Sequence, residues 1–202
     1  MTAGLNRPLP LLVRRVLRLL LKTPVVLLRG FRVEGAERLP ARRRPLILAA
    51  NHAAFIDSVY FILAVRPRFA VCGAKPRFFA TAPRRLLMAI ANILPVHDHD
   101  GFLADCRALL AAGEILLIYP EMGRNPSGMG EFQTWAAEVA LASRAPILPC
   151  YLYGTTEGHA GPPRLIAGEE MEPTGDAALL TRRLREAVAS LAPRSASMGE
   201  SA

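Results

Sequence analysis

The order of hydrophobic and polar positions along the chain predicts an α/β fold. Short, almost uninterrupted apolar runs are typical of buried strands, whereas apolar residues that recur every three or four positions form one face of a helix. The two patterns alternate from residue 31 onward. We expect strands within 31–40, 45–50, 69–74, 93–97, 115–120, 146–155 and 164–168, and helices within 57–65, 83–92, 101–113, 131–143 and 176–192.

Alternating strands and helices indicate a central, mostly parallel or mixed sheet flanked by helices. The pattern divides the chain into a basic segment over residues 1–30, an α/β domain over 31–192 and a small polar tail over 193–202 that we expect to be disordered. In such sheets, binding sites lie beyond the carboxyl ends of the strands. The pairs Asn51-His52 and Pro120-Glu121 and the residues after Tyr151 all fall at these ends.

Residues 9–31 are apolar but are interrupted by cations, namely Arg14, Arg15, Arg18 and Lys22. No part of the segment therefore reaches the roughly 18 apolar residues of a membrane-spanning helix. On a helix the four cations share an arc of roughly 100°, and leucines and valines occupy the rest. This pattern predicts a helix that lies on a membrane surface, with its cations at anionic headgroups. The alternative is a helix packed on its own domain with a solvated basic face.

The positive charge is concentrated at the start of the chain. Residues 1–44 hold eleven Lys or Arg against Glu34 and Glu37, while the whole chain carries +8. This asymmetry favours a polyanionic partner, either a membrane or a nucleic acid. Nucleic acid is disfavoured because the cations alternate with leucine rather than with aromatic residues suited to base stacking. The three separated cysteines show no metal spacing and suggest a reduced, cytosol-facing protein.

The stretch NHAAFID places His52 directly after an apolar run and Asp57 near the start of the next helix. The four residues between them can turn the carboxylate back toward the imidazole. An imidazole held by a carboxylate is a general base near neutral pH. Because the stretch holds no Ser or Cys, the proton source would be a substrate hydroxyl, without a covalent intermediate. The alternative is that Asp57 or Ser58 only caps the helix and His52 is an ordinary loop histidine.

Three further stretches accompany NHAAFID in a fixed order: ILPVHDHDG, YPEMGRN and PILPCYLYGT. The ordered set resembles the glycerolipid acyltransferases of the lysophosphatidate acyltransferase type. That family carries N-H-x-x-x-x-D, a Gly/Arg block around a Pro-Val strand, F-P-E-G-T-R and P-hydrophobic-hydrophobic-P-V. The resemblance covers roughly residues 31–166. It implies transfer of a fatty acyl chain from a thioester, either acyl-CoA or an acyl-carrier protein, to a lipid hydroxyl, with no cofactor and no metal.

The resemblance also implies roles for individual residues. His52 would deprotonate the acceptor hydroxyl, with Asp57 in support. The third block would bind the acceptor through Glu121, Gly123 and Arg124, and Pro149 of the fourth block would lie near the acyl chain. Such a protein would work on membrane lipids at the cytoplasmic face of the membrane, as a peripheral or monotopic protein.

The second block departs from the family pattern. Where the family has an Arg that is thought to meet the acceptor phosphate, this chain has His97, Asp98, His99 and Asp100, and we expect Asp100 to cap the helix that begins at Gly101. Lys75, Arg77 and other nearby cations could supply phosphate contacts instead. Three alternatives therefore stay open: the same chemistry on a phosphate-free acceptor such as a lyso-ornithine lipid or a glycolipid, a catalytically idle lipid-binding scaffold, and a metal site at the alternating His and Asp residues.

Overall fold

A computed structural model describes residues 30–74, 79–90, 92–96, 98–156, 159 and 161–193. The expected membrane-surface helix within residues 1–29, Lys75, Arg77, and the tail from residue 194 lie outside the described residues. Of the helices that are described, none is both long enough and apolar enough to cross a bilayer.

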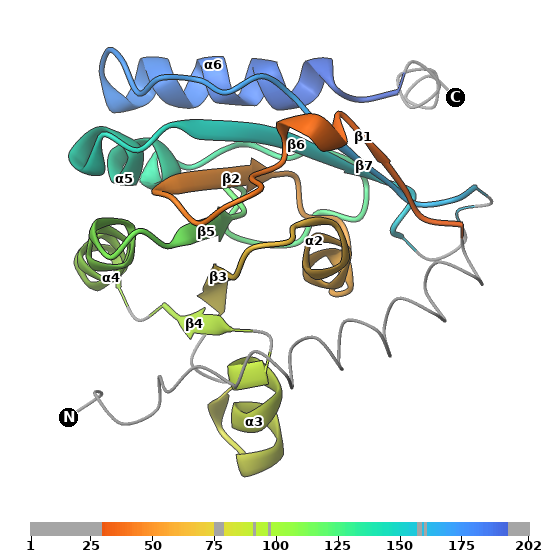
Figure 1. The fold of residues 1–202 in the computed structure, drawn as a ribbon, viewed down its shortest axis with the longest axis horizontal. Helices are drawn as coiled ribbons and strands as arrows, with labels where there is room; N and C mark the ends of the chain where they lie inside the picture. Colours follow the sequence, from red (N-terminus) through yellow and green to blue (C-terminus); the bar gives the residue numbers. More distant parts are fainter. Residues whose placement is uncertain are drawn as a thin grey trace.

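The centre of the domain is a seven-stranded sheet with the order β1-β7-β6-β2-β5-β3-β4 (Figure 1). The strands are β1 (Arg32–Glu34), β2 (Leu46–Ala50), β3 (Phe69–Ala74), β4 (Ile93–Pro95), β5 (Ile115–Ile118), β6 (Ile147–Tyr153) and β7 (Arg164–Ala167). The helices are η1 (Ala36–Arg38), α2 (Asp57–Ala64), α3 (Ala82–Ile90), α4 (His99–Ala111), α5 (Trp135–Ser143) and α6 (Ala177–Ser190). The α/β class predicted from the hydrophobic pattern is confirmed.

The sheet is mixed. Strands β6, β2, β5, β3 and β4 run parallel to one another, β7 is antiparallel to β6, and β1 is parallel to β7. The carboxyl ends of β2, β5 and β6 therefore lie along one edge of the sheet, and those of β1 and β7 lie at the opposite edge. This direction brings the chain segments after β2, β5 and β6 together at a single edge, as parallel strands require.

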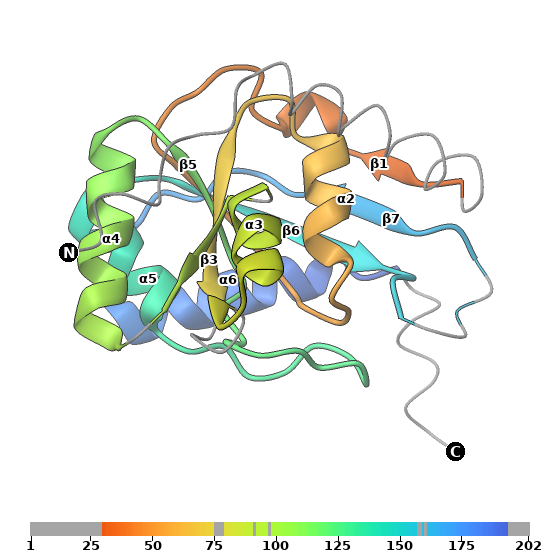
Figure 2. The same cartoon turned by 90° about the horizontal axis from the view of Figure 1, so that it is seen from below.

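Helices cover both faces of the sheet. Helix α2 lies on one face and α5 and α6 lie on the other (Figure 2). Because side chains alternate along a strand, each strand contributes to two separate cores. Ile47 and Ala49 pack with residues of α4, α5 and α6, whereas Leu46, Leu48 and Ala50 pack with residues of α2. The five residues of β2 are fully buried, which fixes this central strand and the position of the residues that follow it.

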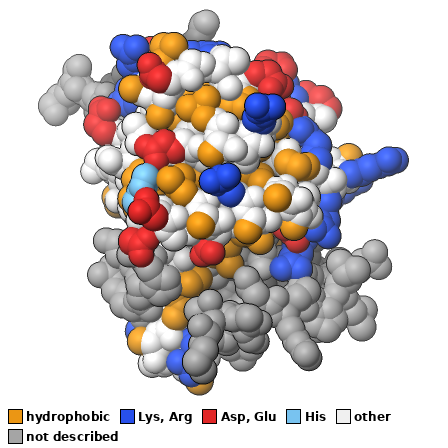
Figure 3. Space-filling view, turned by 90° about the vertical axis from the view of Figure 1, so that its left-hand side faces the viewer, with side chains coloured by type: hydrophobic (Ala, Val, Ile, Leu, Met, Phe, Trp, Pro, Cys, Tyr) orange, Lys and Arg blue, Asp and Glu red, His pale blue; other side chains and the backbone are white. Residues whose placement is uncertain are grey.

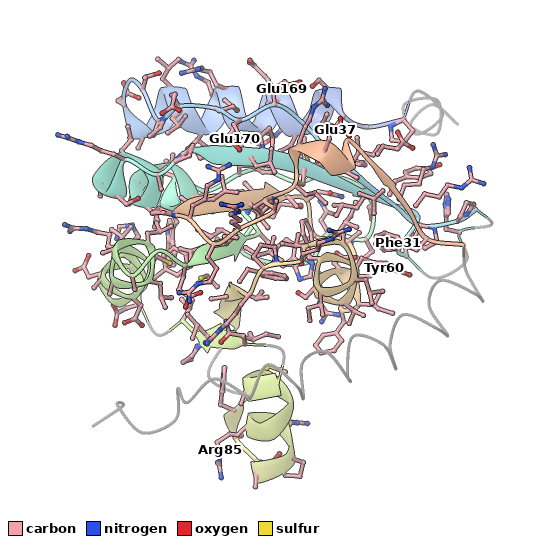
Figure 4. The ribbon with its side chains drawn as sticks, viewed as in Figure 1. Phe31, Glu37, Tyr60, Arg85, Glu169 and Glu170 are labelled. Atoms are coloured by element: carbon pink, nitrogen blue, oxygen red, sulfur yellow. The ribbon has the colours of Figure 1, made fainter. Side chains whose placement is uncertain are left out.

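The start of the described chain is attached to α2. The rings of Phe31 and Tyr60 lie 4.9 Å apart between centroids and are tilted by 43°. Figure 4 shows the two side chains beside each other where β1 passes α2. The contact ties the first described residues to the face of the sheet that carries α2.

Two expected helix caps are wrong. The residue before helix α2 is Ile56, which has no polar side chain with which to cap it. Asp57 does not cap the helix because its carboxylate accepts backbone N–H groups that precede the helix. Helix α4 is capped by Asp98 rather than Asp100, with the backbone N–H of Gly101 donating to Asp98 Oδ1 at 2.7 Å.

Candidate active site

The end of β2 is held against β6 by Asn51. This side chain is 2 % exposed, and it makes two hydrogen bonds with the backbone of Leu152. Its amide donates to the Leu152 carbonyl at 3.0 Å, and the Leu152 N–H donates to Asn51 Oδ1 at 2.7 Å. The side chain thus continues the pairing of β2 with β6 by one residue beyond the strand and fixes the backbone from which His52 projects.

His52 and Asp57 meet as the spacing predicted. His52 Nδ1 lies 2.9 Å from Asp57 Oδ2, and the same oxygen accepts the backbone N–H groups of Ala53 at 2.8 Å and Ala54 at 2.9 Å. Asp57 is fully buried, and the His52 side chain is 17 % exposed. Since a carboxylate can only accept, Nδ1 carries the hydrogen of a neutral imidazole and the lone pair lies on Nε2. The ring therefore presents a basic nitrogen on the edge that faces away from Asp57.

The segment after β5 fixes the backbone of His52 on both sides. The His52 N–H donates to Glu121 Oε1 at 2.8 Å, and the N–H of Asn125 donates to the His52 carbonyl at 2.7 Å. The other Glu121 oxygen accepts the N–H of Gly130 at 2.8 Å. Burial raises the pKa of Glu121, although these backbone hydrogen bonds and the nearby His52 act in the opposite direction. Both carboxylate oxygens thus have backbone partners, and Glu121 positions the loop that carries His52.

Tyr119 packs against one face of the His52 imidazole. Its ring stacks on the His52 ring with 4.0 Å between centroids and 13° between planes, and its hydroxyl lies 3.0 Å from Ser58 Oγ in α2. Burial and the neighbouring Asp57 raise the pKa of the Tyr119 hydroxyl, while the Ser58 hydrogen bond lowers it. We did not expect a role for this residue from the sequence. The available signal was its place directly before Pro120-Glu121 at the end of a buried strand.

The structure separates the remaining expected site residues. Gly123 and Arg124 are exposed in the loop after β5, downstream of Glu121. Pro149 is buried and pairs in register with Ala49, whose side chain belongs to the core formed with α4, α5 and α6. His52 stacks on Tyr119, which belongs to the core on the α2 side. Pro149 and the His52 ring therefore occupy opposite faces of the sheet.

Residues of the second block make contacts at the starts of the neighbouring helices α4 and α5. Asp98 caps α4, and His99 Nε2 lies 2.6 Å from Glu138 Oε2 at the start of α5. The His99 ring also packs edge-on against Trp135. The hydrogen bond with Glu138 raises the pKa of His99, and Asp100 adds to this effect while desolvation opposes it. In the part of the chain that the structure describes, no cluster of three His, Cys, Asp or Glu side chains is suited to a metal ion.

The surface on the side of α4 and α5 mixes charges of both signs with apolar side chains. Basic side chains gather mainly along one flank, and acidic side chains are scattered over the rest (Figure 3). Among the described residues of this face, positive charge is thus confined to part of the surface.

A groove of about 410 Å³ lies at the opposite edge of the sheet, beyond the carboxyl ends of β1 and β7. Its charged side chains pair with one another: Arg38 lies 2.7 Å from Glu169, and Arg44 contacts Glu170. Figure 4 shows Glu37, Glu169 and Glu170 on this part of the molecule. The residues that line the groove include no histidine, and its glutamates lie among arginines that pair with them, so the site at His52 remains the candidate for chemistry.

The geometry defines a class of site: an imidazole paired with a buried carboxylate at the strand ends of an α/β sheet, an arrangement able to accept a proton. Comparison with known proteins gives the family. The family model described as acyltransferase matches residues 30–153, more than half of the chain. The chain therefore belongs to the acyltransferase family, and the resemblance inferred from the four ordered stretches is confirmed.

Two known proteins are similar to the chain. A 1-acyl-sn-glycerol-3-phosphate acyltransferase of Chlamydomonas reinhardtii is 25% identical over 174 residues, which are 79% of this chain and 52% of the relative. The chain thus spans about half the length of that curated relative. The crystal structure of the 1-acyl-sn-glycerophosphate acyltransferase PlsC from Thermotoga maritima matches with a TM-score of 0.68 and 20% identity, covering 88% of this chain and 79% of that chain. At this identity, the second comparison establishes the shared fold.

Proposed function

We propose that the protein transfers a fatty acyl chain from an acyl thioester to the hydroxyl of a lysophosphatidate-like lipid, with His52 as the general base. The observation that carries this proposal is the pair formed by His52 Nδ1 and the fully buried Asp57 carboxylate at 2.9 Å. The names of the two relatives support a lysophosphatidate acceptor. The acyl thioester is that of coenzyme A or of an acyl-carrier protein, and the reaction takes no cofactor.

The proposed reaction is a direct transfer of the acyl group from the thioester to the acceptor, without a covalent acyl-enzyme intermediate. His52 Nε2 accepts the hydroxyl proton while the acceptor oxygen attacks the thioester carbonyl, so that a carbon–oxygen bond forms and a tetrahedral oxyanion appears. The carbon–sulfur bond then breaks, and the imidazolium returns its proton to the departing thiolate. Asp57 remains ionised throughout and stabilises the imidazolium. Asp57 and the backbone hydrogen bonds made by Glu121 and Asn125 hold the base in one orientation while the proton moves.

A phosphate-free acceptor is a second candidate, and the second block favours it. In the place where the resembled family has a cation for the acceptor phosphate, Asp98 caps a helix and His99 is paired with Glu138. An acidic side chain near a phosphate group is repulsive. A lyso-ornithine lipid, a glycolipid or another alcohol would avoid this repulsion while the chemistry at His52 stayed the same.

We also propose that the protein works at the cytoplasmic face of a membrane, as a peripheral or monotopic protein. The basic amphipathic pattern of residues 9–31 supports this placement. The loop that connects His52 to Asp57 adds a second argument, because Phe55 within it is 56% exposed. An exposed aromatic ring beside the base would contact the same lipid surface from which the acceptor is drawn.

The test is an assay of the purified protein with labelled acyl-CoA and labelled acyl-carrier protein across a panel of acceptors with and without phosphate. Wild-type protein should acylate lysophosphatidate, and His52→Ala should lower the rate by about 10²- to 10⁴-fold. His159→Ala is a matched control, since that ring contacts Tyr153 and not Asp57. Activity confined to phosphate-free acceptors would replace the first candidate with the second. Wild-type protein that shows only the background rate, as His52→Ala does, would leave the idle scaffold as the better account.

A further inference from the structure

The position of Tyr119 suggests a role in the chemistry at His52. Its side chain is 7% exposed and follows directly after β5, the strand that neighbours β2 in the sheet. The ring is held in place from a second direction by Phe61, whose ring meets it edge-on at 6.4 Å and 74°. Tyr119 is therefore a fixed surface on which another group can rest.

We propose that Tyr119 is a positioning residue for the proposed base, and that its ring orients the His52 imidazole and stabilises the imidazolium that forms when the acceptor loses its proton. This proposal rests on the proposed function. The near-parallel stack, with 4.0 Å between ring centroids and 13° between planes, restricts tilting of the imidazole. Asp57 fixes one edge of the same ring through Nδ1. A ring fixed at one edge and one face has a single orientation in which Nε2 can meet an acceptor.

The stack also favours the charged form of the imidazole. The face of an aromatic ring carries negative quadrupolar potential, and it attracts a cation placed over it. The imidazole of His52 lies over this face and gains positive charge only while it holds the transferred proton. The attraction is therefore larger in the transition state than in the ground state, which is the condition for an effect on kcat. Asp57 from α2 and Glu121 from the loop after β5 are the acidic groups that face the same imidazole.

The hydroxyl of Tyr119 makes a contact of its own, with helix α2. It lies 3.0 Å from Ser58 Oγ, and Ser58 is the residue directly after Asp57 in the first turn of α2. This hydrogen bond connects the end of β5 to the start of the helix that carries the carboxylate. The ring thus acts on the base, whereas the hydroxyl acts on the element that positions Asp57.

Two substitutions separate the tasks. Tyr119→Phe keeps the ring and removes the hydroxyl, and Tyr119→Leu removes both. We expect Tyr119→Leu to lower kcat by about 3- to 30-fold with KM nearly unchanged, and Tyr119→Phe to lower it by less than about threefold. Ser58→Ala removes the other partner of the same hydrogen bond, so its combination with Tyr119→Phe should cost no more than either change alone.

Proton NMR can detect the stacking of His52 on Tyr119 without any assay of activity. The carbon-bound protons of the His52 ring lie over the Tyr119 ring and should resonate upfield of an unstacked imidazole. The signals can be assigned by their disappearance in His52→Gln. They should stay upfield in Tyr119→Phe and move downfield in Tyr119→Leu. Phe69→Leu is the matched control, since it removes a buried aromatic ring from the same core at the opposite end of β5, in register with Ile115 and away from Tyr119.

The outcomes are distinct. Upfield His52 signals that are lost in Tyr119→Leu, together with a fall in kcat that Phe69→Leu does not reproduce, would support the proposal. Wild-type His52 signals at the position of an unstacked imidazole would overturn it, and this result needs no variant of Tyr119 to fold. A folded Tyr119→Leu protein with unchanged kcat would overturn it as well. Retained activity in His52→Ala would instead remove the proposed function, so the two failures are told apart.

Discussion

The carboxylate of Asp57 allows the sharpest test of the proposed chemistry. Asp57→Asn keeps the size of the side chain and removes only its charge. In the wild-type protein, Oδ2 accepts three hydrogen bonds, from His52 Nδ1 and from the backbone N–H groups of Ala53 and Ala54. The amide oxygen of asparagine must take this place, because an NH₂ group there would face three donors. The loop between His52 and α2 should therefore keep its conformation.

The effect on the rate can be estimated from the geometry. With roughly 4 Å between the centres of the imidazolium and carboxylate charges, their attraction is about 4 kcal/mol at an effective dielectric constant of about 20. A transition state in which half to all of the proton has moved would lose about 2 to 4 kcal/mol, which corresponds to about 30- to 1,000-fold in kcat. KM should change little, because Asp57 is fully buried and contacts His52 rather than a ligand.

The effect on stability should be smaller. Asp57 Oδ1 is buried and has no hydrogen-bond partner in the described residues, so the new NH₂ group would be an unpaired donor there. Such a group costs about 1 to 3 kcal/mol. The assay is acyl transfer from a labelled thioester at saturating acceptor, and thermal unfolding confirms that the variant is folded. A folded Asp57→Asn protein with kcat within about threefold of wild type would refute the reasoning, because the carboxylate would then not stabilise a transferred proton.

Three other features of the structure carry predictions. Asn51→Ala should lower the free energy of unfolding by about 2 to 4 kcal/mol, because it leaves two buried backbone groups of Leu152 unpaired; urea titration measures this, and a loss below about 0.5 kcal/mol would contradict it. His99 has a raised pKa, so its pairing with Glu138 should stabilise the fold fully below about pH 6.5 and lose this effect as the pH rises through the raised value. The difference in Tm between wild type and His99→Gln should therefore be largest near about pH 5.5 and vanish in alkaline buffer, and a difference that is independent of pH would argue against the ion pair. Phe55→Ala should weaken co-sedimentation with anionic vesicles by about tenfold at most and raise KM for vesicle-borne acceptor without changing kcat, whereas unchanged binding would remove this ring from the lipid contact.

The sequence predicted the parts of the fold that depend on local pattern. The buried run 46–50 and the apolar strand 115–118 lie at the centre of the sheet because they lack polar residues on either face. Their parallel direction brings His52 and Glu121 to the same edge. The return of Asp57 to the imidazole was also predictable, since a six-residue turn that ends in a helix can place the two side chains together.

Other parts of the site depend on information that a linear pattern does not contain. An aromatic residue at the end of a buried strand is ordinarily part of the core, so Tyr119 gave no sign of its stack on His52. Pro149 was assigned to the site by its place in an ordered stretch, but the alternation of side chains along β6 turns it to the opposite face. The cap of α4 shifted from Asp100 to Asp98 because one residue of backbone geometry decides which carboxylate reaches the free N–H groups.

The bridge made by Glu121 has a consequence for how this protein can change. One carboxylate accepts the backbone N–H groups of His52 and Gly130, so the loop from Glu121 to Gly130 is closed on its own first residue and attached there to the backbone of His52. Within that loop, Gly123 and the side chains of Arg124, Pro126 and Ser127 are open to solvent. Under the proposed function, exchange of these exposed residues can therefore change the acceptor preference while the contacts that fix His52 stay the same.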